Sequence, residues 1–205
     1  TAEQSVQEAF EKGLLGEKDE CAFASTDRKT AYSEISGQNI NLNINNLYPD
    51  DTSVELTVKS DVLSDVYTSK IDVSKSGASV SIPLKDNLTA GEYNITYSML
   101  LKNGKTVEKT GIIEVKAPEY KQMKVGESAD ISVDSIKSCE ISDDKILEII
   151  DGKITAKAEG TAFVLVKADE ENSYCFKVTI GHTEEKIDSK PATCTKTGLT
   201  EGTKC

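Results

Sequence analysis

Apolar and polar residues alternate along most of the chain from residue 30 onward. The clearest run is 38–45, where Ile40, Leu42 and Ile44 are separated by asparagines. In an extended strand, successive side chains point to opposite faces, so this pattern places one face in a core and the other in water. Such half-buried strands are typical of antiparallel sheets.

Seven segments between residues 30 and 116 show this alternation and are predicted to be strands. They are 30–35, 38–45, 53–60, 66–73, 78–84, 91–101 and 105–116. Turn-forming residues separate several of them, for example Tyr48–Asp51 and Lys102–Gly104. Many short strands with regular turns indicate a two-sheet sandwich.

The segment 88–93, with the sequence LTAGEY, resembles a tyrosine corner. In that motif a tyrosine near the start of a strand bonds through its hydroxyl to backbone a few residues upstream. We therefore expect Leu88 to be buried, Gly91 to permit the turn and Tyr93 to make this bond. A core tyrosine after an ordinary turn is the alternative.

A different period marks the N-terminus. Val6, Ala9, Phe10 and Leu14 recur at the spacing of one helix face, which predicts a short helix over 3–15. A helix of about 12 residues is marginal alone, so this face should pack on another element.

Ala117-Pro118 separates the first strand-rich region from a second, shorter one. Alternation returns there, and we predict that Ile154 and Val178 are buried in its core. Asp151-Gly152 is typical of a tight hairpin, because glycine adopts the positive φ that such a turn requires.

Residues 119–181 resemble the bacterial immunoglobulin-like group two family. The family's turn and strand motifs correspond to Val125-Gly126-Glu127, the run from Gly152 to Ala156, Gly160-Thr161-Ala162 and Val178-Thr179-Ile180. The resemblance implies an immunoglobulin-like domain of an exported bacterial protein. Cys139 stands where the family usually has a buried tryptophan.

The last segment, 182–205, lacks strand-length alternation. It resembles a short repeat at the ends of Gram-positive surface proteins, in which a histidine precedes P-A-T-C-T and a later C-x-x-C-G. The sequence stops at Cys205, the first cysteine of that final pair, and we interpret the chain as a fragment of a longer protein.

These patterns predict an all-β fold of two tandem immunoglobulin-like β-sandwiches with a short N-terminal helix. The expected domains are an N-terminal helix and lead-in (1–29), an immunoglobulin-like sandwich (30–117), a group two domain (118–181) and a partial Cys/His-containing tail (182–205).

Charge and composition exclude several partners. The 205 residues carry a net charge of -11, and Arg28 is the only arginine. The chain has no cluster of basic residues and only one arginine with which to bind phosphates or base edges, so nucleic-acid recognition is not expected. No apolar run approaches the roughly 20 residues that span a bilayer, so membrane insertion of this fragment is not expected either.

The five cysteines leave two questions open. His182, Cys194 and Cys205 could be part of a zinc site completed beyond Cys205, but in an exported protein a disulfide is the simpler fate of the thiols. Cys139 and Cys175 belong to opposite strand faces, which argues against a disulfide between them. The pattern predicts that Cys139 is buried and that Cys175 points outward at the surface.

No residue is assigned a catalytic, cofactor-binding or metal-ligating role. The only histidine is His182, with no nucleophile motif around it, so an enzyme is not expected. The chain has no tryptophan, and a carbohydrate platform would have to use tyrosine.

The favoured hypothesis is a non-catalytic spacer or adhesion segment of an exported bacterial cell-surface protein, with an unknown protein or carbohydrate ligand. The alternative is an accessory immunoglobulin-like segment of a larger secreted enzyme, such as a glycoside hydrolase or peptidase. No cofactor is expected, and the location is extracellular or at the cell surface of a Gram-positive bacterium.

Overall fold

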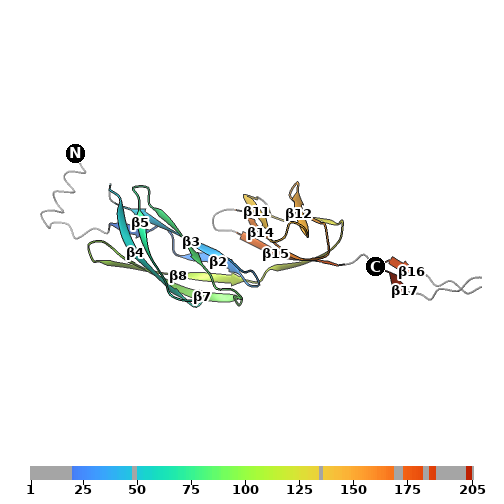
Figure 1. The fold of residues 1–205 in the computed structure, drawn as a ribbon, viewed down its shortest axis with the longest axis horizontal. Helices are drawn as coiled ribbons and strands as arrows, with labels where there is room; N and C mark the ends of the chain where they lie inside the picture. Colours follow the sequence, from blue (N-terminus) through green and yellow to red (C-terminus); the bar gives the residue numbers. More distant parts are fainter. Residues whose placement is uncertain are drawn as a thin grey trace, which may run out of the picture. The chain divides into compact units, whose positions relative to one another are not determined.

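The structure, a computed structural model, describes residues 20–47, 50–133, 136–168, 173–181, 185–187 and 202–204. The described residues form strands, turns and loops, so the fold is all-β (Figure 1). The chain divides into two compact units, Thr1–Lys116 and Ala117–Cys205. The helix predicted over 3–15 lies outside the described residues.

The first unit is built from two sheets. Its strands are β1 (Cys21–Phe23), β2 (Arg28–Tyr32), β3 (Asn39–Asn46), β4 (Thr52–Ser60), β5 (Tyr67–Val73), β6 (Ala78–Pro83), β7 (Gly91–Leu100) and β8 (Thr106–Lys116). One sheet has the order β1-β3-β6 and the other has the order β2-β8-β7-β4-β5. Successive strands change sheets at β1–β2, β2–β3, β3–β4, β5–β6 and β6–β7. Strand β2 runs parallel to β8, and the other pairs are antiparallel. This is an immunoglobulin-like arrangement.

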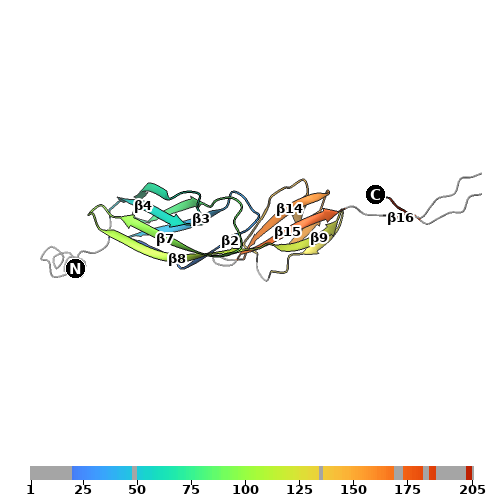
Figure 2. The same cartoon turned by 90° about the horizontal axis from the view of Figure 1, so that it is seen from below.

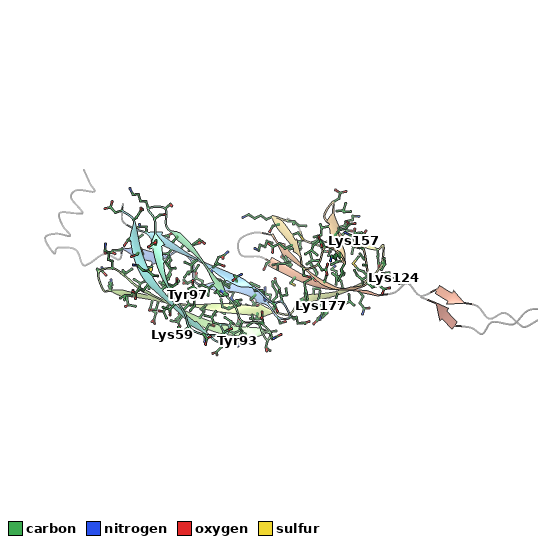
Figure 3. The ribbon with its side chains drawn as sticks, in the orientation of Figure 1. Lys59, Tyr93, Tyr97, Lys124, Lys157 and Lys177 are labelled. Atoms are coloured by element: carbon green, nitrogen blue, oxygen red, sulfur yellow. The ribbon has the colours of Figure 1, made fainter. Side chains whose placement is uncertain are left out.

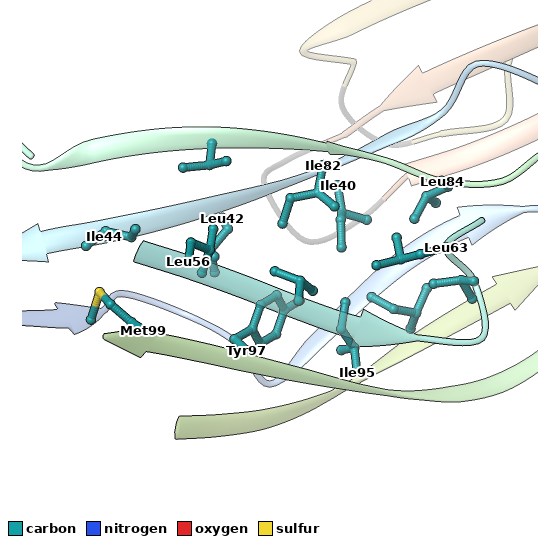
Figure 4. Packing of buried hydrophobic residues seen from close by; sticks show 14 of the residues in the cluster. Ile40, Leu42, Ile44, Leu56, Leu63, Ile82, Leu84, Ile95, Tyr97 and Met99 are labelled. Atoms are coloured by element: carbon teal, nitrogen blue, oxygen red, sulfur yellow. The ribbon is translucent and has the colours of Figure 1, made fainter. Parts of the chain in front are cut away.

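The buried residues between the two sheets are those that the alternation predicts. Ile40, Leu42 and Ile44 from β3 are at most 3% exposed, and they face Leu56 and Tyr97 from the other sheet (Figure 4). Each strand thus contributes one apolar face, and the asparagines between them remain exposed.

The first unit begins earlier than residue 30, where the sequence places the start of the sandwich. Cys21–Phe23 pairs with the end of β3, and Cys21 is fully buried. The 1–29 lead-in therefore contributes strand β1 and the start of β2. A strand of three residues is too short to show a period, which is why the pattern does not reveal β1.

The tyrosine corner is confirmed. Tyr93 Oη donates a hydrogen bond of 2.8 Å to the carbonyl of Thr89, Leu88 is buried, and Gly91 has φ of 154°. The bond ties the start of β7, where Tyr93 lies (Figure 3), to the loop that leads into it.

Removing this bond tests its contribution to stability. We expect Tyr93→Phe to lower the free energy of unfolding by about 1 kcal/mol, the net value of one hydrogen bond. Urea denaturation followed by circular dichroism measures it, with Tyr174→Phe, on an exposed ring of the second unit, as the control. An unchanged midpoint for Tyr93→Phe would mean that the corner does not stabilise the fold.

Tyr97 presents the opposite case within the same strand. Its side chain is fully buried, and its hydroxyl has no hydrogen-bond partner among the residues that the structure describes. Burial raises the pKa of Tyr97 to about 12, because ionisation would place a charge in the core.

We expect Tyr97→Phe to leave the free energy of unfolding unchanged or raise it by up to about 1 kcal/mol, because the variant no longer buries an unsatisfied hydroxyl. The raised pKa also makes the stability of the unchanged chain depend on pH. Between the unfolded-state pKa of 10 and the folded-state pKa of about 12, Tyr97 ionises more readily in the unfolded chain, so the folded state loses stability as pH rises through this range. Thermal unfolding from pH 7 to pH 11.5 should therefore show a shallower alkaline decline in the variant. A clear loss of stability at pH 7 would contradict this.

The second unit also has two sheets. Its strands are β9 (Glu119–Lys124), β10 (Ser128–Asp130), β11 (Ser138–Ile141), β12 (Leu147–Ile150), β13 (Lys153–Ala156), β14 (Gly160–Lys167) and β15 (Ser173–Gly181). The orders are β10-β13-β12 and β11-β14-β15-β9, with β9 parallel to β15. Ile154 and Val178 are fully buried between these sheets, as predicted. Asp151 and Gly152 have φ of 49° and 74°, which confirms the tight turn between β12 and β13.

The tail contains a pair of strands that the sequence does not predict. β16 (Glu185–Ile187) pairs antiparallel with β17 (Gly202–Lys204). Three-residue strands again show no period, and their two halves are far apart in the sequence.

Candidate functional site

The four-stranded sheet of the second unit has one face in the core and one face away from it. Ala162, Val164 and Val166 of β14 point into the core, where each is fully buried. Phe163 and Leu165 therefore point to the other side, which we call the outer face. Both are large apolar residues on the side that alternation normally leaves to polar ones.

Two aromatic rings and a lysine form a row across this outer face. Phe163 on β14, Lys177 on β15 and Tyr120 on β9 are direct neighbours in register, and the three strands lie side by side (Figure 2). Lys177 Nζ lies 5.4 Å from the ring centroid of Tyr120 and 5.8 Å from that of Phe163. These distances fit cation–π contacts with both rings. Tyr120 is 62% exposed, so the row is accessible to solvent.

A polar row lies beside the aromatic one. Thr161, Thr179 and Gln122 occupy the next register positions of the same three strands, and all three are exposed. The hydroxyls of Thr161 and Thr179 are 3.4 Å apart. The outer face thus offers ring surfaces and hydrogen-bonding groups in adjacent rows.

The charge of the outer face differs from that of the chain. Register places Lys124, Lys167 and Lys177 on it with one acidic residue, Glu140. The strands of this face therefore carry a charge of +2, whereas the whole chain carries -11. A positive sheet face in an acidic protein favours an anionic contact over a cationic one.

Cys175 is the main correction to the sequence analysis of this region. It does lie on the outer face, opposite Leu165, but it is 4% exposed and is not the surface cysteine that the pattern predicts. The strand face is predicted correctly, whereas the exposure is not. A small side chain between the larger Leu165 and Lys177 is shielded by them, which alternation alone does not reveal.

Cys139 lies on the core side of β11 and packs against the second core, but it is half-buried and not fully buried as predicted. Partial burial, and then the neighbouring Glu140, raise the pKa of its thiol. Register places Cys139 opposite Val166 on the core face and Cys175 opposite Leu165 on the outer face. The two thiols point to opposite sides of the sheet and form no disulfide with each other, as predicted.

The tail residues considered for zinc, His182, Cys194 and Cys205, lie outside the described residues. Within the part of the chain that the structure describes, no three His, Cys, Asp or Glu side chains lie close enough to hold a metal ion.

The single arginine is occupied by carboxylates. Arg28 donates hydrogen bonds of 2.7 Å to Glu92 and 2.9 Å to Glu114 on neighbouring strands of the first unit. These bonds raise the pKa of Arg28. Its guanidinium serves a surface ion-pair network of the five-stranded sheet.

A hollow in the first unit has a volume of about 250 Å³ and is lined by Leu63, Ser64, Asp65, Val66, Tyr67, Pro83 and Leu84. Val66 is 55% exposed there. The lining is mostly apolar, and its carboxylate is that of Asp65, so it lacks the converging polar groups that a specific small-molecule site requires.

No motif in the sequence marks the outer face of this sheet as a contact site. The signal was present in β14 itself, because Ala162, Val164 and Val166 form a complete apolar set of the opposite parity. A strand that is apolar on both faces indicates that its second face is also covered or used in contacts.

Comparisons with known proteins give little further information. No family model matches the chain, and no curated protein matches it. Among solved structures, a Bacteroides ovatus protein of a mixed-linkage glucan utilization locus, SGBP-B in complex with a mixed-linkage heptasaccharide, is 16% identical over 80% of this chain and 48% of its own, with a TM-score of 0.29. The chain thus spans about half of that protein.

Two other similar structures are made of modules. The Clostridium thermocellum CbhA fibronectin(III)-like modules are 13% identical over 79% of this chain and 94% of theirs, with a TM-score of 0.28. The titin domains z1z2, in complex with telethonin, are 12% identical over 82% and 99%, with a TM-score of 0.29. The immunoglobulin-like class of this chain rests on its own sheet order and register.

Among the described residues, no helix has the length and apolar character required to cross a bilayer.

Proposed function

We propose that this chain is a non-catalytic adhesion segment of an exported bacterial cell-surface protein, and that it makes contact through the outer face of its second unit. The observation that carries the proposal is the row of Phe163, Lys177 and Tyr120 on the outer sheet face, where Tyr120 is 62% exposed. Apolar and aromatic side chains gathered at an accessible surface are typical of contact sites.

The family resemblance supports the exported location. We infer that 119–181 is a group two bacterial immunoglobulin-like domain, in which Gly126 and Gly152 supply turn positions with φ of 84° and 74°.

Location is tested on intact cells of the source bacterium. We expect an antibody raised against the chain to label intact cells, and external protease to remove the labelled protein. Recovery of the native protein only from the cytoplasmic fraction would contradict the proposal.

The adhesive role is tested separately in the chromosomal gene. We expect the double substitution Tyr120→Ala and Lys177→Gln to reduce adherence of the cells while surface labelling is retained. Tyr174→Ala, which removes a ring that is 45% exposed on the opposite side of β15, is the matched control. Unchanged adherence of the double variant would remove the adhesive role and leave that of a spacer.

A further inference from the structure

We propose that the outer face of the second unit binds an acidic polysaccharide, with Tyr120 and Phe163 as stacking surfaces and Lys177 as the contact for its carboxylates. This inference rests on the proposed function, because it names the partner class of the same face. Three features of the outer face support this partner: the spacing of the two rings, the polar row beside them and the positive charge of the face.

The spacing of the rings suits a chain of sugars. Tyr120 and Phe163 lie on strands separated by β15 alone, so the two rings are about two interstrand spacings, or about 10 Å, apart. This is close to the length of a disaccharide unit, so successive units of a polysaccharide could stack on both rings. The row runs across three paired strands, and we refer to it as the platform.

Lys177 supplies the charge at the centre of this platform. Its ammonium lies within 6 Å of both ring centroids, at 5.4 Å and 5.8 Å. The two rings restrict the side chain before any ligand arrives, which reduces the conformational entropy that binding would otherwise cost. An acidic group on a sugar stacked at either ring would lie close to this ammonium.

The polar row supplies the remaining groups that a sugar requires. Thr161, Thr179 and Gln122 offer two hydroxyls and an amide beside the rings. A pyranose has apolar C–H faces and a rim of hydroxyls, so it needs a ring surface and hydrogen-bonding groups next to each other.

Charge distinguishes an acidic polysaccharide from a neutral one. The outer-face strands carry +2 through Lys124, Lys167, Lys177 and Glu140, in a chain of -11. Neutral glycans would gain nothing from this local excess, whereas anionic ones are attracted to it and repelled by the rest of the surface.

An acidic peptide is the competing occupant, and the geometry disfavours it. Peptides that bind sheets usually add a strand at a free edge, where backbone hydrogen bonds are available. The row instead crosses β14 and β15, whose backbone groups are already paired on both sides, and reaches the edge strand β9 only at Tyr120. A peptide lying across Phe163 and Lys177 would therefore rely on side chains alone.

The test uses the full 205-residue chain and three acidic probes: oligogalacturonate, hyaluronate and alginate. We expect calorimetric titration to detect binding of at least one of them. We also expect about tenfold weaker binding when NaCl rises from about 0.05 M to about 0.5 M, because the contact is electrostatic. For the probe that binds, blocking its carboxylates as methyl esters should weaken binding by about tenfold or more.

Variants locate the site. Tyr120→Ala, Lys177→Gln and Phe163→Leu should each weaken binding by about tenfold or more, and the last keeps an apolar side chain so that folding is preserved. Tyr174→Ala, on the opposite side of β15, and Lys59→Gln, on β4 of the first unit (Figure 3), should bind as the unchanged chain does. Hydrogen exchange of the β14 and β15 amides checks that each variant is folded.

Three results would overturn the inference: no binding of any acidic probe, equal binding of the methyl ester, or equal binding of poly-L-glutamate at the same charge concentration. The last result would point to an acidic peptide. These failures are distinct from failure of the proposed function, since a chain found on the cell surface that binds no acidic polysaccharide would lose only its named partner. A chain that binds one but is found in the cytoplasm would lose only its proposed location.

Discussion

Replacing Gly111 with alanine is expected to lower the free energy of unfolding of the first unit by about 3 kcal/mol or more. A Cβ atom at this position would lie 1.8 Å from the carbonyl oxygen of Thr26 and 3.1 Å from that of Asp27. Both obstacles are backbone atoms, so no side chain can rotate out of the way.

The surroundings of Gly111 prevent the backbone from yielding cheaply. The Ile112 amide donates a 2.8 Å hydrogen bond to the carbonyl of Asp27, which holds the link between β1 and β2 against β8. Thr26 is itself buried. Moving this link would strain or break the parallel pairing of β2 with β8.

Urea denaturation measures the loss, and hydrogen exchange locates it. Protection should fall in β2 and β8 and stay unchanged in β14 and β15, because the two cores are separate clusters. Gly181→Ala is the matched control, since a Cβ there meets nothing within 4 Å. A Gly111→Ala variant as stable as this control would show that the close approach of Thr26 is not required by the fold.

The alternation of apolar and polar residues predicts the strands of the first unit because these strands have one buried face and one face exposed to solvent. β3, with its apolar isoleucines and leucine separated by asparagines, was predicted to within a residue at each end, at 38–45 against Asn39–Asn46. The alternation in β3 reflects burial of one strand face, and this information is local to the strand's own sequence.

Elements that depend on distant partners were not predictable in this way. β1 has three residues, and its position is fixed by pairing with the end of β3. The approach of Thr26 to Gly111 joins segments 85 positions apart, and no local pattern encodes it. In both cases the position depends on tertiary contacts, which the local sequence does not specify.

The candidate site shows the same limit. Register shows that Lys177 and Tyr120 share the outer face with Phe163 and Leu165, although they come from two other strands. One of these, β9, runs parallel to β15. The assembly of the row depends on β9 pairing with β15 and not on any motif. Because each of the three strands contributes one residue to the row, the residues have no regular spacing along the sequence that could predict the site.

Replacing Ile154 with aspartate is expected to lower the free energy of unfolding of the second unit by at least about 3 kcal/mol, because an unpaired charge would be buried without hydration. Ile154 is fully buried in the centre of β13, between Ala129 on β10 and Ile149 on β12. These register neighbours are apolar, so neither can pair with the new carboxylate.

The adjacent residue provides the control for this substitution. Thr155 lies on the opposite face of β13, where its hydroxyl is 3.0 Å from that of Ser128, and it is only half-buried. We expect Thr155→Asp to cost less than about 1 kcal/mol, since its carboxylate can remain in water. Thermal unfolding compares the two, and hydrogen exchange should show lost protection in β13 and β14 for Ile154→Asp only. Equal melting temperatures for the two variants would mean that the core-facing side of β13 has been assigned wrongly. The outer face of the opposite sheet is assigned from the same core, so that assignment would fail as well.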